Sequence, residues 1–165
     1  MPINGINQPE QIGVSPNLRL RKFDGIPQGA LGWYQDEELV WLVDGVRNRY
    51  TPERLNAMYT YLNKVGELYI IEVLEGDAFI PIGDVTFWEE DMPIVIGNPG
   101  YRNRGIGKSV IETLIKRAKE LGFGSLSVAE IYDYNGGSRH CFESAGFRMK
   151  EKTERGASFF IDLNE

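Results

Sequence analysis

The sequence predicts one α/β domain of the α+β kind, because expected strands and helices follow one another along the whole chain. Its 165 residues suit one domain with an ordinary hydrophobic core. Hydrophobic residues make up 42% and charged residues 25% of the chain, as in a typical globular protein. No repeat, low-complexity tract or long linker divides it. We therefore expect a leader over residues 1–16 and one folded domain over residues 17–165.

The first part of the chain predicts one strand and then several helices. The leader is rich in Gly, Pro, Asn and Gln and is expected to lie on the surface. Residues 18–23 alternate apolar and basic side chains, which predicts a half-buried strand, and residues 30–43 predict one or two short helices. Thr51 and Pro52 suit the cap and first turn of a longer helix that ends at Gly66.

The rest of the chain predicts most of the strands. They are expected over residues 67–74, 79–88, 92–96, 125–131, 147–152 and 157–163. Gly76 and Asp77 suit a hairpin turn between the first two. An amphipathic helix is predicted from Lys108 to Leu121, and a short helix over residues 135–145 is closed by Gly146.

Composition excludes several classes of function. The net charge of −6 disfavours nucleic acid as a partner; it suits a cationic substrate, although acidic proteins also gain solubility from such a charge. Cys141 is the only cysteine, which excludes an intrachain disulfide and a zinc site built from cysteines. No apolar run approaches the roughly 18 residues of a membrane span, and the N-terminus does not resemble a secretory signal. We expect a cytoplasmic protein with no membrane partner and no metal.

The segment Pro99–Ser109 carries the strongest functional signal. It is a short basic loop with glycines, preceded by an apolar strand and followed by the amphipathic helix. The first backbone N–H groups of a helix have no partner within the helix, and the helix dipole adds positive potential there. The sequence therefore predicts an anion site at this helix start.

Two nucleotide motifs fail at this loop. A P-loop requires a glycine where the chain has Arg102, five residues before Gly107. A dinucleotide fingerprint would use Gly105 and Gly107 but requires a third glycine where the chain has Val110.

A third interpretation joins this loop to a second pattern. The loop itself reads Arg102-Asn-Arg-Gly105-Ile-Gly107, an Arg/Gln-x-x-Gly-x-Gly/Ala pattern. The second pattern begins 28 residues after Gly107 and consists of Asn135, Ser138, Phe142-Glu143 and Gly146-Phe147. Each pattern alone is also explained by a tight turn or a helix stop. Together they resemble the GNAT superfamily of acyl-CoA-dependent N-acyltransferases.

The resemblance implies both a fold and a reaction. It implies a mixed central sheet of about six or seven strands, with one strand splayed from its neighbour at the cofactor and about four flanking helices. The implied reaction is direct transfer of an acetyl group from acetyl-CoA to a primary amine. Residues 67–163 carry the resemblance, whereas residues 18–65 match in pattern only.

The resemblance also implies which residues contact acetyl-CoA. The backbone of Val95, Ile96 and Gly97 would pair with the pantetheine arm. The pyrophosphate would be bound by Arg102, Arg104, Gly105, Ile106, Gly107, Lys108 and Ser109. The second pattern would add Asn135, Ser138 and Arg139. Glycines let the backbone approach closely, while amides and cations bind phosphate.

The chemistry requires a group that takes a proton from the amine, which is almost entirely protonated at neutral pH. Glu130 is the first candidate, because members that acetylate ribosomal proteins carry their proposed base at this position. Glu89 and Glu90 are second candidates. The usual proton-donating tyrosine is replaced here by Phe142, so Tyr132, Tyr134 or water would protonate the leaving thiolate.

The acceptor is expected to be a small-molecule or peptide amine. Trp33, Trp88 and Glu89 belong to two aromatic, acidic segments that would form its wall, which favours an aminoglycoside- or polyamine-like cation. A protein N-terminus and a non-catalytic acyl-CoA-binding module are the alternatives. His140 and Cys141 are neighbours on a helix and do not face each other, so we expect a surface or interface histidine and a core cysteine. The sequence leaves the oligomeric state open and permits a homodimer.

Overall fold

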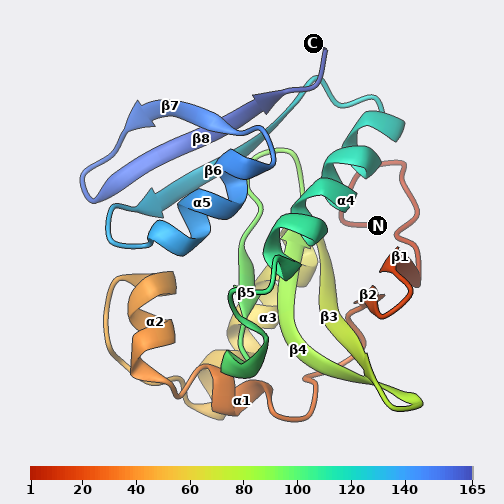
Figure 1. Cartoon of the computed structure of the whole chain (residues 1–165), viewed down its shortest axis with the longest axis vertical. Coiled ribbons are helices and arrows are strands. Elements are labelled where there is room, and N and C mark those ends of the chain that lie inside the picture. Colours follow the sequence, from red (N-terminus) through yellow and green to blue (C-terminus); the bar gives the residue numbers. More distant parts are fainter. Residues whose placement is uncertain (165) are drawn as a thin grey trace. The chain divides into compact units, whose positions relative to one another are not determined.

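The computed structural model describes residues 1–164. The chain forms two compact units: the first comprises residues 1–86 and 94–102, and the second comprises residues 87–93 and the chain from Asn103 onward. Five α-helices and eight strands occur among the described residues (Figure 1). The predicted α/β class is confirmed.

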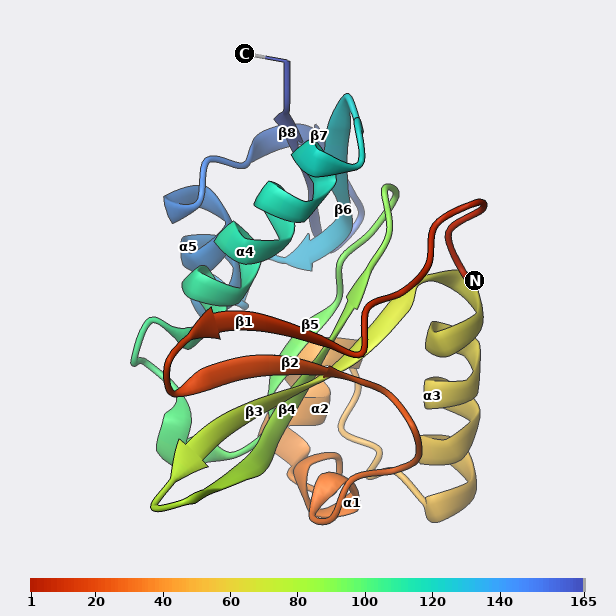
Figure 2. The ribbon, with the colours of Figure 1, turned by 90° about the vertical axis from the view of Figure 1, so that its right-hand side faces the viewer.

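A five-stranded sheet is the frame of the first unit. Its strands stand in the order β1 (Gln11–Ser15), β2 (Leu18–Lys22), β3 (Glu67–Glu75), β4 (Ala78–Phe87) and β5 (Ile94–Ile96). Figure 2 shows β1 to β4 side by side. The predicted hairpin turn joins β3 to β4, where Gly76 has φ 64°, a conformation that favours glycine.

Strand β1 lies within the segment that we expected to be a surface leader. Gln11 lies opposite Arg21 and Ile12 opposite Leu20 in an antiparallel ladder with β2. Two apolar residues, Ile12 and Val14, alternate with polar or small ones here. This is the period of a strand, but the pattern is short and the surrounding Gly, Pro, Asn and Gln residues conceal it.

Three helices belong to the first unit: α1 (Ala30–Trp33), α2 (Glu37–Asp44) and α3 (Pro52–Val65). Residues 30–43 therefore form two short helices, as one of the two expectations stated. Asp36 caps α2 by accepting a hydrogen bond from the Glu38 amide at 3.0 Å. Thr51 caps α3 at its predicted start. Helix α3 contacts β3 and buries Leu55, Tyr59 and Leu62.

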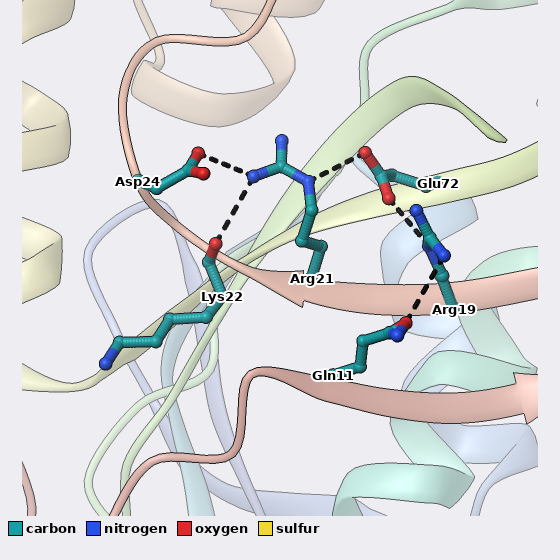
Figure 3. Close-up of polar contacts among 6 residues, drawn as sticks. All are labelled: Gln11, Arg19, Arg21, Lys22, Asp24 and Glu72. Carbon is teal, nitrogen blue, oxygen red and sulfur yellow. Dashed lines mark hydrogen bonds and ion pairs between the residues drawn. The ribbon is translucent and has the colours of Figure 1, made fainter.

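A buried ion-pair cluster joins β2 to β3. Glu72 of β3 is only 5% exposed and lies opposite Arg19 of β2. Arg19 Nε and Arg21 Nε each donate to one of its carboxylate oxygens at 2.8 Å, and Arg21 also binds Asp24 (Figure 3). Two guanidinium groups thus replace the water that the carboxylate loses on folding.

The second unit contains α4 (Ile106–Glu120), α5 (Gly136–Ser144) and a three-stranded sheet. The sheet order is β6 (Ser125–Tyr132), β8 (Gly156–Asp162) and β7 (Arg148–Lys152). Helix α4 contacts α5 and β6, and in Figure 1 α5 lies beside this sheet. The apolar face that the sequence predicted for α4 is buried and consists of Val110, Ile111, Leu114, Ile115 and Ala118.

The arrangement of strands differs in detail from one mixed sheet of six or seven strands with about four helices. The described strands number eight because β1 was missed, and they form two sheets whose assigned ladders are antiparallel. Strand β5 has only three residues, since Gly97 and the 3₁₀ turn Pro99–Tyr101 follow it at once. Among the described residues, no helix has the length and apolarity needed to cross a membrane.

Candidate active site

The end of β5 is held by the first arginine of the glycine loop. Arg102 Nε donates to the Ile96 carbonyl at 2.9 Å, and its Nη2 donates to the Gly97 carbonyl at 3.2 Å. The same Nη2 lies 3.9 Å from a carboxylate oxygen of Asp36. The Arg102 side chain is therefore engaged by the strand that precedes the loop. This is a different use from the phosphate contact that we expected of it.

Trp33 lies directly against the backbone at the end of β5. A Cβ atom added to Gly97 would come within 2.2 Å of the Trp33 ring, so only glycine fits beneath the indole. Gly83 of β4 is equally confined, because its Cβ would lie 2.0 Å from the Val95 carbonyl oxygen. Trp33 is 8% exposed. The predicted acceptor residue thus covers one residue of the predicted pantetheine strand.

In the second unit, helix α4 starts two residues earlier than expected. Gly105 is its N-cap with φ 77° and provides no side-chain cap, and the first turn contains no acidic residue. Arg104, Lys108 and Ser109 are exposed there. An uncapped, exposed helix start flanked by cations is the arrangement that binds phosphate.

Cys141 of α5 packs against this helix start. Its Sγ would lie 3.2 Å from a Cβ on Gly107, so the glycine gives the thiol room. Burial raises the pKa of the Cys141 thiol, and a hydrogen bond with the Lys108 backbone opposes that rise. Cys141 is half-buried rather than fully in the core, and His140 beside it is exposed, as expected.

Asn135 caps helix α5. Its Oδ1 accepts a hydrogen bond from the Ser138 amide at 3.1 Å, which is the usual role of asparagine at a helix start. Arg139 pairs with Glu143 at 3.1 Å and lies over the Phe159 ring. The second pattern therefore has a structural role, and its contact with the pantetheine arm stays a prediction.

Glu130 lies at a bulge in β6, and Asp91 binds the backbone of the residue before it. The register of β6 with β8 shifts between Val128 and Ile131, and Glu130 in this interval is exposed and accepts a hydrogen bond from Thr153 Oγ1. Asp91 accepts a hydrogen bond from the Ala129 amide at 3.0 Å. Burial raises the pKa of Asp91, although its backbone hydrogen bonds oppose the rise.

Asp91 is the acidic residue that sequence reasoning underrated. We expected it only as part of the wall that begins at Trp88. No local pattern marks it, because its partner, the Ala129 amide, lies 38 residues away in the chain. The segment between β4 and β5, which contains Asp91, is also fixed by the Ser127 amide, which donates to the Glu89 carbonyl at 3.0 Å. Among the described residues, no cluster of His, Cys, Asp and Glu is arranged to hold a metal.

The family is decided by a match over most of the chain. The model of the acetyltransferase (GNAT) family matches residues 32–147. The chain belongs to the GNAT family. An uncharacterized N-acetyltransferase of Bacillus subtilis, YfmK, is 32% identical over 134 residues, which cover 79% of this chain and 84% of that protein.

Solved GNAT structures share this fold at low sequence identity. A GNAT-family acetyltransferase from Bacillus anthracis superposes with a TM-score of 0.71 at 17% identity, covering 90% of this chain and 96% of that one. Spermidine N-acetyltransferase from Vibrio cholerae, solved with CoA and spermine, gives a TM-score of 0.67 at 15% identity and covers 91% and 98%. The family and the enzyme class that the resemblance implied, a GNAT acetyltransferase, are therefore confirmed.

This GNAT chain has an aromatic cluster near its second pattern. Phe142 is 1% exposed and packs edge-on against Phe147 with ring centroids 5.1 Å apart. Tyr132 and Tyr134 are stacked with centroids 5.4 Å apart, and Arg155 lies over the Tyr132 ring. Phe142 is a core residue without a transferable proton, so Tyr132 and Tyr134 carry the nearest phenols in the sequence.

Proposed function

We propose that this GNAT N-acetyltransferase acetylates a primary amine of a small polycation, of the polyamine or aminoglycoside kind. The observation that carries the proposal is the acidic segment Glu89–Asp91, which is fixed to β6 by the Ser127 and Ala129 amides, together with Glu130 of that strand. Glu89 and Glu90 are exposed, and no described cation forms an ion pair with either. Unneutralised carboxylates attract cationic substrates and speed their encounter.

Acetyl-CoA is the proposed acetyl donor, and solved relatives were obtained with CoA or acetyl-CoA. In this proposal the backbone of residues 95–97 pairs with the pantetheine arm. The amides of residues 104–109 and the side chains of Arg104 and Lys108 bind the pyrophosphate. Arg102 supports the strand and is also proposed at the pyrophosphate, and Asn135, Ser138 and Arg139 add the remaining contacts.

The reaction is proposed to be direct. The neutral amine nitrogen attacks the thioester carbonyl carbon, the C–S bond breaks, and the nitrogen releases its second proton to water as the amide forms. The thiolate takes a proton from Tyr132, which water then reprotonates, or from water directly. Glu130 takes the proton that the ammonium group must lose first. Asp91 is a second acid beside β6, where it accepts a hydrogen bond from the Ala129 amide and burial raises its pKa above the ordinary value.

An amine panel tests this proposal. Purified protein is given acetyl-CoA with spermidine, an aminoglycoside or a peptide bearing a free N-terminus, and both thiol release and product mass are recorded. We expect turnover with the polycations and little with the peptide. Peptide acetylation alone would favour the N-terminal acetyltransferase, and acetyl-CoA binding without any transfer would favour a non-catalytic module.

Three variants divide the roles of the acids. Glu130→Gln should lower kcat about 100-fold or more, the scale of losing general-base catalysis, whereas Glu89→Gln combined with Glu90→Gln should raise the KM of the polycation. Asp91→Asn is the matched control for the base: a larger loss of kcat in Asp91→Asn than in Glu130→Gln would transfer the role to Asp91.

A further inference from the structure

Asp84 is a fully buried acid in the middle of β4 that the proposed chemistry does not use. It is 2% exposed, and both phenols that bind it donate to the same carboxylate oxygen, Oδ2: Tyr34 at 2.7 Å and Tyr59 at 2.9 Å. No described cation forms an ion pair with Asp84. An acid buried without a cation costs stability unless its hydrogen bonds compensate.

The two phenols come from different parts of the first unit. Tyr59 lies in α3, and Tyr34 directly follows α1. The Tyr34 carbonyl also accepts a hydrogen bond from the Tyr50 amide at 2.9 Å, and its ring lies 4.9 Å from the Tyr50 ring. Tyr34 is thus fixed at its backbone, its ring and its hydroxyl group.

The residue beside Tyr34 is Trp33, whose indole covers Gly97. Residues this close in the chain share one backbone turn, because the Tyr34 amide donates to the Ala30 carbonyl and the Trp33 amide to the Gly29 carbonyl. Moving the Tyr34 hydroxyl away from Asp84 would move that turn. The Asp84 carboxylate, the Tyr34 hydroxyl group and the Trp33 indole over Gly97 thus form one connected set of contacts.

We propose that Asp84 is a positioning residue for acetyl transfer: through the Tyr34 hydroxyl it fixes Trp33 over Gly97 and so shapes the place where the amine binds. The kinetic part rests on the proposed function, because it assumes that residues 95–97 hold the pantetheine arm and that Trp33 contacts the acceptor. The structural part, the control of Trp33 by Asp84, does not need that assumption.

The chain provides a matched pair of variants. Tyr34→Phe and Tyr59→Phe each remove one phenol from the same oxygen of Asp84, and both side chains are 1% exposed. Only Tyr34 is joined to Trp33. We expect Tyr34→Phe to raise the KM of the amine about fivefold, with the Kd of acetyl-CoA unchanged. Tyr59→Phe should change the KM of the amine less than twofold.

A readout that needs no activity keeps the two proposals separate. The chain has three tryptophans, so protein labelled with 5-fluorotryptophan gives three ¹⁹F signals, and Trp33→Phe identifies the one from Trp33. That signal should shift or broaden in Tyr34→Phe and in Asp84→Leu, which removes the acceptor oxygens, but stay in place in Tyr59→Phe. If the wild type acetylates no amine, the proposed function fails while this spectrum still decides the role of Asp84.

Equal changes in Tyr34→Phe and Tyr59→Phe, in the spectrum or in the KM of the amine, would overturn the proposal, because loss of stability alone predicts them. An unmoved Trp33 signal in Asp84→Leu would also overturn it. Near-UV circular dichroism confirms that each variant is folded. Should Tyr34→Phe not fold, Asp84→Leu, which removes both acceptor oxygens and leaves the phenols in place, carries the test.

Discussion

Glu72 of β3 and Asp84 of β4 are buried acids on neighbouring strands of one sheet, yet different groups surround them. Two guanidinium groups bind Glu72 at 2.8 Å each (Figure 3), whereas two phenols bind Asp84. Ion pairing favours the charged form, and burial without a cation disfavours it. Burial raises the pKa of Asp84 to about 6, although both phenol hydrogen bonds lower it.

The difference separates a structural acid from a positioning acid. Glu72 joins β2 to β3 and touches nothing that the proposed reaction uses. Burial of the Asp84 carboxylate lowers the stability of the folded protein. Asp84 binds Tyr34, which is next in the chain to Trp33, and Trp33 covers the end of β5. Perturbed acids of this kind gather at functional sites more often than well-paired ones.

The largest expected effect comes from removing both phenols. The double variant Tyr34→Phe, Tyr59→Phe leaves a buried carboxylate with neither hydrogen bond, which should cost about 4 kcal/mol of unfolding free energy at pH 8. At pH 5 the carboxyl is protonated and the cost should fall. Urea unfolding at the two pH values measures this. An equal cost at both would show that Asp84 does not carry the charge assigned to it.

A second effect is the pH dependence of Asp84→Asn. The folded-state pKa of Asp84 is raised from 3.8 to about 6, so the folded protein binds this proton more tightly than the unfolded chain does. Ionisation of Asp84 therefore lowers the free energy of unfolding as the pH rises between these two values. Above pH 7 the loss is about 3 kcal/mol. The asparagine variant lacks it, so its stability relative to wild type should rise between pH 4 and pH 7. Parallel curves would contradict the shifted pKa.

Glu72→Gln should lower the free energy of unfolding by about 2 kcal/mol. This loss is smaller because Arg19 and Arg21 are partly exposed and regain water when the carboxylate is removed. Salt should reduce it, since screening weakens partly exposed ion pairs. Thermal unfolding in low and high salt measures the difference. A loss of amine turnover in this variant would remove the contrast between the two acids.

The smallest effect is expected for Arg21→Lys, which should lower the free energy of unfolding by under about 1 kcal/mol. Lysine keeps the charge but cannot bind Glu72 and Asp24 together through one planar fork. Arg19 still neutralises Glu72. Thermal unfolding should show a small decrease in Tm, and a decrease as large as that of Glu72→Gln would mean that Arg21 alone neutralises this acid.

Much of the fold was readable from the sequence because its signals are local. The Thr51 cap, the Gly76-Asp77 turn and the apolar face of α4 each depend on residues close in the chain. Strand β1 was missed because its pattern spans five residues within a turn-rich composition. The division of the strands into two sheets depends on pairing partners far apart in sequence, which periodicity does not specify.

The backbone features of the candidate site could be predicted from the sequence, whereas most of its side-chain contacts could not. Glycine spacing and the helix start pointed to the anion site at residues 104–109. The use of Arg102 by two β5 carbonyls, the indole over Gly97 and the phenols on Asp84 are contacts between distant segments. A pattern of residue types identifies which side chains are available but not which partners they meet.

The contrast between the two acids is tested most directly by the KM of the acetylated amine in Asp84→Leu and Glu72→Gln, measured under identical conditions with saturating acetyl-CoA. Leucine removes both acceptor oxygens, so we expect Asp84→Leu to raise this KM about fivefold and Glu72→Gln to leave it at the wild-type value, even though both variants lower Tm. Changes in KM that follow the loss of Tm in both variants would contradict the assignment of Asp84 as a positioning residue.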